Sequence, residues 1–261
     1  MKFRSASNSS AEMPFLDHLE ELRWRILWSL LALVLCSVGA FFVVTYLDVI
    51  GLLKRPIEPY LENGELVFLA VTDPLFITFK VAVAIGFVVA SPIIFYHVWT
   101  FLSPALLQKE RRAIVPALYL GLILFAAGVA LAYFAALPFT IEFMMNFQTE
   151  SLEPMITAAD YFSFVVKLLL AFGVVFEMPV VFSVLAAIGL VSSKFLKQKR
   201  RYAVAALVVL SAVITPGDAI TATAILLGPL LLLYELSILL TKVVERGRLA
   251  ESSDDALPEP S

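Results

Sequence analysis

Long apolar runs constrain this sequence more than any other feature. Four segments, at residues 26–46, 75–98, 113–137 and 161–190, each hold more than 20 residues with at most two charged side chains. An α-helix rises 1.5 Å per residue, so about 20 residues cross the roughly 30 Å of hydrocarbon in a bilayer. Because 61% of the chain is hydrophobic and only 16% is charged, we predict an all-α polytopic membrane protein.

Two further apolar segments bring the predicted number of transmembrane helices to six. The fifth, at residues 202–214, would cover only about 20 Å as a helix and is too short for an undistorted bilayer. The sixth, at 219–240, is long enough, but Gly228 and Pro229 interrupt it and predict a kink. A tight turn, TPGD at 215–218, joins the two.

The distribution of basic residues predicts the orientation of these spans. Fifteen lysines and arginines lie in the N-terminus, the second and fourth loops and the C-terminus, whereas the other loops hold only Lys54 and Arg55. Basic residues near span ends are retained on the cytoplasmic side, so both termini are predicted to be cytoplasmic. The external loops are long and rich in proline, which favours an ordered cap.

Three regions follow from this topology. Residues 1–25 form a cytoplasmic segment in which the apolar spacing of 14–26 predicts an amphipathic helix lying in the interface before the first span. Residues 26–241 form the transmembrane domain. Residues 242–261 are acidic and are predicted to be a disordered cytoplasmic tail. No cleavable signal peptide precedes the first span.

Two acids on the basic side stand out. Glu21 has Arg25 four residues on, so periodicity favours a solvated helical ion pair. Glu110 lies in SPALLQKERR, and at helical spacing its neighbours are all apolar. A carboxylate there needs a cation from elsewhere. A lysine of the 194–201 loop and a second molecule are both candidates.

Within the fourth span, Glu177 is costly to bury and should face protein or water. Pro179 leaves the carbonyl of Val175 without its helical donor, so a protonated Glu177 that bonds this carbonyl competes with a functional role. Lys80 and Lys167 lie near external span ends, where snorkelling explains them. The two histidines have no ligand-spaced partner, so no metal site is predicted. Neither a catalytic constellation nor a case for nucleic-acid binding is present, and no cofactor is expected.

Five motifs together resemble the TatC family, the multispanning receptor subunit of the twin-arginine protein translocase. They cover nearly the whole chain in order, as FLDHLEELRWR, TDPLFITFK, VWTFLSPALLQKERR, AFGVVFEMP and KRRYAVAALVVLSAVITPGD. The resemblance implies a concave, glove-like bundle of six spans with an external cap, and a receptor for paired-arginine signal peptides of folded cargo. It also implies protonmotive-force-driven export, without an enzyme activity, in a prokaryotic plasma (inner) membrane. TatA- and TatB-type single-span partners and self-association in a larger complex are expected.

The resemblance also assigns roles to individual residues. Glu21 and Glu110 are expected to form the acidic patch that receives the arginine pair, because two placed carboxylates can distinguish the arginine fork from lysine. Glu177 and Pro179 match the acid and proline of the membrane groove, and Pro56 matches the external cap. Pro216 and Asp218 match the turn between the short helices, although Gly217 replaces a proline common in the family. The positions expected to shape the acidic patch are Arg23, Phe101, Pro104, Arg111 and Arg112.

Two other classes of protein compete with this interpretation. An ion-coupled small-solute transporter would use Glu177, Lys80 and the broken helices, but the acids at the cytoplasmic surface and the lack of repeated halves disfavour it. A lipid-modifying membrane enzyme would need a nucleophile or a metal constellation.

Overall fold

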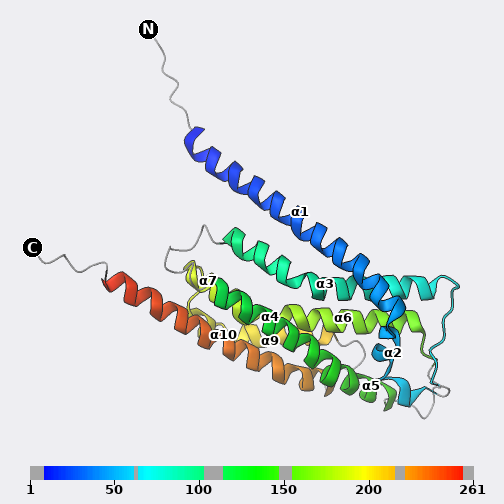
Figure 1. Cartoon of the computed structure of the whole chain (residues 1–261). Helices are drawn as coiled ribbons and strands as arrows, with labels where there is room; N and C mark the ends of the chain where they lie inside the picture. Colours follow the sequence, from blue (N-terminus) through cyan, green and yellow to red (C-terminus); the bar gives the residue numbers. More distant parts are fainter. Residues whose placement is uncertain (1–8, 62–63, 103–113, 147–154, 215–220, 255–261) are drawn as a thin grey trace, which may run out of the picture.

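The computed structural model describes residues 9–61, 64–102, 114–146, 155–214 and 221–254. Within these ranges, five helical segments are long and apolar enough to cross a membrane. Both the start of α1 and the end of α10 lie at one end of the molecule, whereas α2 lies at the opposite end (Figure 1). The predicted all-helical membrane protein is confirmed.

The first helix, α1 (Ser9–Tyr46), is one continuous helix of 38 residues. The predicted interfacial helix therefore does not turn before the first span but continues straight into it. The physical reason is local, since no glycine or proline lies between Pro14 and Gly39 to interrupt the helical backbone. The helix packs mainly against α3 (Asp73–Leu102) and leaves most of its apolar side chains exposed, as expected for a surface facing lipid.

A short region predicted to be external follows α1. It contains α2 (Val49–Lys54), whose N-cap Asp48 accepts a hydrogen bond from the amide of Gly51, and the 3-10 helix η1 (Glu58–Tyr60). Val67 then pairs with the chain at 156–158, where the amide of Ala158 donates to its carbonyl at 2.8 Å. The ordered cap predicted from the prolines is thus built from two short helices and one bridge.

The third predicted span is longer than expected. α4 (Ile114–Leu131) passes through one π-helical turn, η4 (Ala132–Ala136), into α5 (Leu137–Asn146). Pro138 has no amide to donate to the preceding turn, and a π turn accommodates that missing bond without ending the helix. The helix therefore includes residues 138–146, which the sequence had suggested as external loop.

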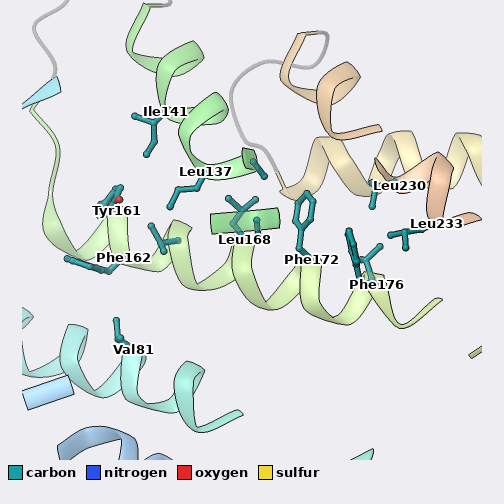
Figure 2. Packing of buried hydrophobic residues seen from close by; sticks show 14 of the residues in the cluster. Val81, Leu137, Ile141, Tyr161, Phe162, Leu168, Phe172, Phe176, Leu230 and Leu233 are labelled. Carbon is teal, nitrogen blue, oxygen red and sulfur yellow. The ribbon is translucent and has the colours of Figure 1, made fainter. Parts of the chain in front are cut away.

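The fourth span breaks at Glu177. α6 (Ala158–Phe176) ends there, and α7 (Met178–Ala187) begins with Pro179 in its first turn. The core follows one face of α6, where Phe162, Val165, Leu168 and Phe172 recur at helical spacing and are almost completely buried. Figure 2 shows Leu168 beside Leu137 of α5, and Phe176, farther along α6, beside Leu230 and Leu233 of the last helix.

The last three helices of the chain pack against one another. α8 (Ser193–Gln198) leads into α9 (Arg200–Ile214), which at 15 residues remains shorter than the other spans, and α10 (Thr221–Asp254) continues through Pro229 as one helix. Ser193 donates to Glu245 at 2.6 Å, and the Tyr234 hydroxyl donates to the carbonyl of Leu196 at 2.7 Å, so α8 is fastened to α10. The segment from residue 242, predicted to be disordered, is helical as far as Asp254.

Candidate functional site

The acid predicted at the start of the first span, Glu21, is held by two basic neighbours of its own helix. The Arg25 guanidinium donates to Glu21 Oε1 from Nε at 3.0 Å and also from Nη2, and His18 Nδ1 lies 3.7 Å from the other carboxylate oxygen. The Glu21 side chain is 35% exposed, so solvent still reaches it. The helical ion pair predicted from the spacing is confirmed, and Glu21 is accessible but already has a partner.

An aromatic contact brings this part of α1 to the end of α3. The rings of His18 and Phe101 stack with centroids 4.4 Å apart and planes only 9° apart. Phe101 lies two residues before the segment 103–113, which contains Glu110 and lies outside the described residues. Residues 18–25 of α1 and the chain entering SPALLQKERR therefore lie side by side, as the acidic-patch hypothesis requires.

The other predicted members of the patch divide into two groups. Arg23 is exposed on α1 and makes no ion pair among the described residues. The remaining members lie outside the described residues: Pro104, Arg111 and Arg112. Pro216 and Asp218, predicted for the short-helix turn, also lie outside them.

A small cavity adjoins the Glu21 region. It has a volume of about 340 Å³ and lies between α1 and α3, lined by Leu22, Ile26 and Phe101 among others. The Arg25 and His97 side chains also reach it, and the Nδ1 atom of His97 is buried without a hydrogen-bond partner in the described structure. An apolar pocket thus lies one helical turn beyond the charged cluster formed by His18, Glu21 and Arg25.

Glu177 lies at the break between α6 and α7, beside Gly121 of α4. A Cβ atom on Gly121 would lie 3.0 Å from Glu177 Oε2, so the glycine makes room for the carboxyl group. Glu177 Oε1 is buried and has no hydrogen-bond partner in the described part of the chain. No hydrogen bond joins the Glu177 carboxyl group to the Val175 carbonyl in the described structure, and the Glu177 backbone amide donates to that carbonyl instead.

An apolar groove of about 680 Å³ runs between α3, α4 and α6. Its walls include Val81, Ala126 and Leu169, and α2 covers its outer end through Leu52 and Leu53. Pro56, predicted for the cap, lies half-buried just after α2. Glu177 is not among the groove-lining residues, although it lies farther along the same α4–α6 contact.

Two tyrosines that sequence reasoning missed connect the cap to the bundle. The Tyr133 hydroxyl of η4 donates to the carbonyl of Leu52 at 2.7 Å, and the Tyr161 hydroxyl of α6 donates to the carbonyl of Leu53 at 2.7 Å. Both acceptor carbonyls lie in the last turn of α2, where a carbonyl has no amide four residues on within the same helix. The only signal in the sequence was an aromatic hydroxyl at the end of each of two apolar runs.

Taken together, the helical bundle, the charged cluster at one end and the covered apolar groove define a multispanning membrane protein built for binding rather than for catalysis. The family model described as "Sec-independent protein translocase protein (TatC)" matches residues 17–229. The chain therefore belongs to the TatC family. It is a core subunit of a protein translocase, a transport component and not an enzyme, which sets the small-solute transporter and the lipid-modifying enzyme aside.

Individual relatives agree with this assignment. The Sec-independent protein translocase protein TatC of Aquifex aeolicus is 40% identical over 239 residues, covering 90% of this chain and 98% of the relative. TatCy of Bacillus subtilis is 34% identical, with 94% of each chain covered. Among solved structures, a crystal structure of the twin-arginine translocase receptor TatC superimposes with a TM-score of 0.75 at 39% identity, covering 87% of this chain and 99% of that one. The form of that receptor in DDM gives a TM-score of 0.77 at 40% identity.

Proposed function

We propose that this chain is the receptor that binds the paired arginines of a signal peptide on folded cargo, at the end of the bundle where α1 begins. The observation that carries the proposal is the His18–Phe101 stack, since it brings Glu21 beside the chain that leads to Glu110. Two carboxylates supplied by different segments would receive two adjacent guanidinium groups. Charge-assisted, forked hydrogen bonds would then select arginine over lysine.

The rest of the peptide requires an apolar surface. The pocket lined by Leu22 and Ile26 lies next to the charged cluster and can accept an apolar side chain near the arginine pair. The groove beneath α2 offers a longer apolar surface within the membrane. Burial of apolar area contributes about 25 cal/mol per Å², so these surfaces supply affinity while the acids supply specificity.

The orientation and partners belong to the same proposal. In this proposal the end of the bundle where α1 begins and α10 ends faces the cytoplasm of a prokaryote, with the bundle in the plasma (inner) membrane; the excess of lysine and arginine in the N-terminus, the second and fourth loops and the C-terminus supports this orientation. Single-span partners of the TatA and TatB type, and further copies of this chain, would complete a translocase driven by the protonmotive force. Glu177, with an unpartnered carboxylate oxygen, is the candidate for contact with such a partner or with a proton.

The test compares two acids near the charged cluster. Glu110→Gln should abolish export of a folded cargo with a paired-arginine signal, while the protein remains in the membrane. Glu20→Gln is the matched control, because Glu20 is exposed on α1 and makes no ion pair among the described residues. Crosslinking of the signal peptide to purified protein should be lost in the first variant and kept in the second. Normal export by the Glu110 variant would contradict the proposed role of this residue.

A further inference from the structure

A second cavity, of about 960 Å³, opens beside α6 at the same end of the bundle as α2. Its walls come from α5, α6 and the short helix α9, and they are largely apolar, with Met144, Met145, Leu170 and Leu210 among them. Methionine side chains adapt to flexible apolar chains. The cavity lies on a different face of α6 from the groove covered by α2, and only Leu170 lines both.

The length of this cavity indicates what kind of molecule fits it. Along α6 it extends from Asp160 to Ala171, which is about 16 Å at 1.5 Å per residue. Half of a bilayer's hydrocarbon core is about 15 Å thick, whereas a membrane-spanning helix needs about 30 Å of contact. The cavity therefore matches the depth of one leaflet and is too short for a partner's spanning helix.

Two lysines border the same cavity. Lys167 lines it directly, and it makes neither an ion pair nor a hydrogen bond with any described residue. Lys80 reaches across from α3 and donates to the hydroxyl of Ser163, another lining residue, at 2.5 Å. An ammonium group has three donors, so Lys80 keeps two for another acceptor. Both lysine side chains are exposed, and their stems are long enough to bring the charged ends toward the headgroup region.

One acid also faces the cavity and must be accounted for. Asp160 lines its outer end, and Asp160 Oδ2 accepts a hydrogen bond from the Thr157 hydroxyl at 2.7 Å. That contact leaves the other carboxylate oxygen free for a donor. The cavity therefore presents one acceptor at its outer end and two cations along its length, beside a largely apolar wall.

We propose that this cavity binds an anionic phospholipid of the leaflet on the α2 side. Its acyl chains lie against the apolar wall, Lys80 and Lys167 bind the phosphate, and Asp160 accepts a hydroxyl of the headgroup. Lysine is an established phosphate binder. The short α9 leaves a space beside α6 that the described residues do not fill, and one lipid fills it. This inference does not depend on the proposed signal-peptide site.

The test uses the full-length protein in proteoliposomes with two photoactivatable lipids that share the same acyl chains, phosphatidylglycerol and phosphatidylcholine. After irradiation, mass spectrometry measures the yield of lipid attached at Met144, Met145 and Leu210. Phosphatidylglycerol should label these residues more than phosphatidylcholine does. Lys80→Gln and Lys167→Gln should each reduce the phosphatidylglycerol yield about fivefold. The matched control, Lys194→Gln with Lys197→Gln, removes two exposed lysines of α8 and should leave the yield unchanged.

Three results would overturn the proposal. The first is equal labelling by the two lipids in the unaltered protein, a comparison that requires no variant to fold. The second is an undiminished yield in a doubly substituted Lys80 and Lys167 protein. The third is a photocrosslink from Met144, Met145 or Leu210 to a helix of another protein in native membranes, without any lipid adduct at these residues. That result would make the cavity a protein-docking site.

Discussion

Replacing the two cap tyrosines with phenylalanine tests how α2 is held over the apolar groove. Tyr161→Phe and Tyr133→Phe each delete one hydroxyl and leave the ring in place. The two hydroxyls differ in their surroundings, since Tyr161 is 4% exposed and Tyr133 is only half-buried. Their acceptors differ as well. The Leu52 carbonyl also accepts from the Arg55 amide at 3.3 Å, whereas the described structure gives the Leu53 carbonyl no donor besides Tyr161.

These differences give the two substitutions unequal effects. A hydrogen bond contributes about 0.5–1.5 kcal/mol net, and a buried acceptor left without a donor costs the upper part of that range or more. We therefore expect Tyr161→Phe to lower the free energy of cap opening by about 1.4 kcal/mol, a tenfold increase in the open population. Tyr133→Phe should lower it by about 0.5 kcal/mol, roughly a twofold increase.

Hydrogen–deuterium exchange of the α2 amides measures this opening. The Leu52 amide donates to the Asp48 carbonyl and the Arg55 amide to the Gly51 carbonyl, so both exchange only when the helix opens. Tyr46→Phe is the control, because Tyr46 precedes α2, is 81% exposed and makes no hydrogen bond among the described residues. Unchanged exchange in Tyr161→Phe, or a larger effect from Tyr133→Phe, would refute the reasoning.

Three further predictions concern the α4–α6 contact and the charged cluster. Gly128→Ala should lower the free energy of unfolding in detergent by about 1–3 kcal/mol, seen as a lower melting temperature, because the added Cβ would lie 2.8 Å from a backbone oxygen of α6. Gly39→Ala is the control, since a Cβ added at Gly39 would have no neighbour within 4 Å. Glu177→Gln should leave the melting temperature unchanged or raised, since Oε1 has no partner to lose; a clear decrease would reveal a partner. Arg25→Gln should raise the affinity for arginine-pair and for lysine-pair signal peptides by a similar small factor, measured by peptide titration, and unchanged affinities would show that Arg25 does not compete for Glu21.

The spans were predictable because apolar length is a local property. The breaks were predictable only where a residue removes a backbone donor, as Pro179 does at the end of α6. The interfacial helix predicted before the first span instead continues into that span as one helix, because amphipathic spacing reports which face is apolar and not whether the axis bends. The π turn before Pro138 could not be derived from composition, since a proline can end, kink or widen a helix according to its tertiary contacts.

The cap contacts lay beyond sequence reasoning for a different reason. Tyr133 and Tyr161 are 81 and 108 residues from the carbonyls they bind. Within an apolar run, a tyrosine is indistinguishable from a core aromatic until the fold shows where its hydroxyl points. Lys80 and Lys167 raise the same problem, because snorkelling explains each lysine separately and only the packing of α3 on α6 brings both to one cavity.

The ion pair between Glu21 and Arg25 changes what recognition at this site requires. A visiting cation does not meet a free carboxylate but must displace a guanidinium that donates two N–H groups to one oxygen. An arginine can replace that fork with an equivalent one, and an exposed i,i+4 pair costs only a few tenths of a kcal/mol to give up. A lysine offers a compact ammonium in place of the fork, so it loses this competition even though its charge is the same. Displacing Arg25 costs an arginine and a lysine ligand the same few tenths of a kcal/mol, so the resident pair lowers both affinities equally, and selection of arginine rests on the fork that only arginine can restore.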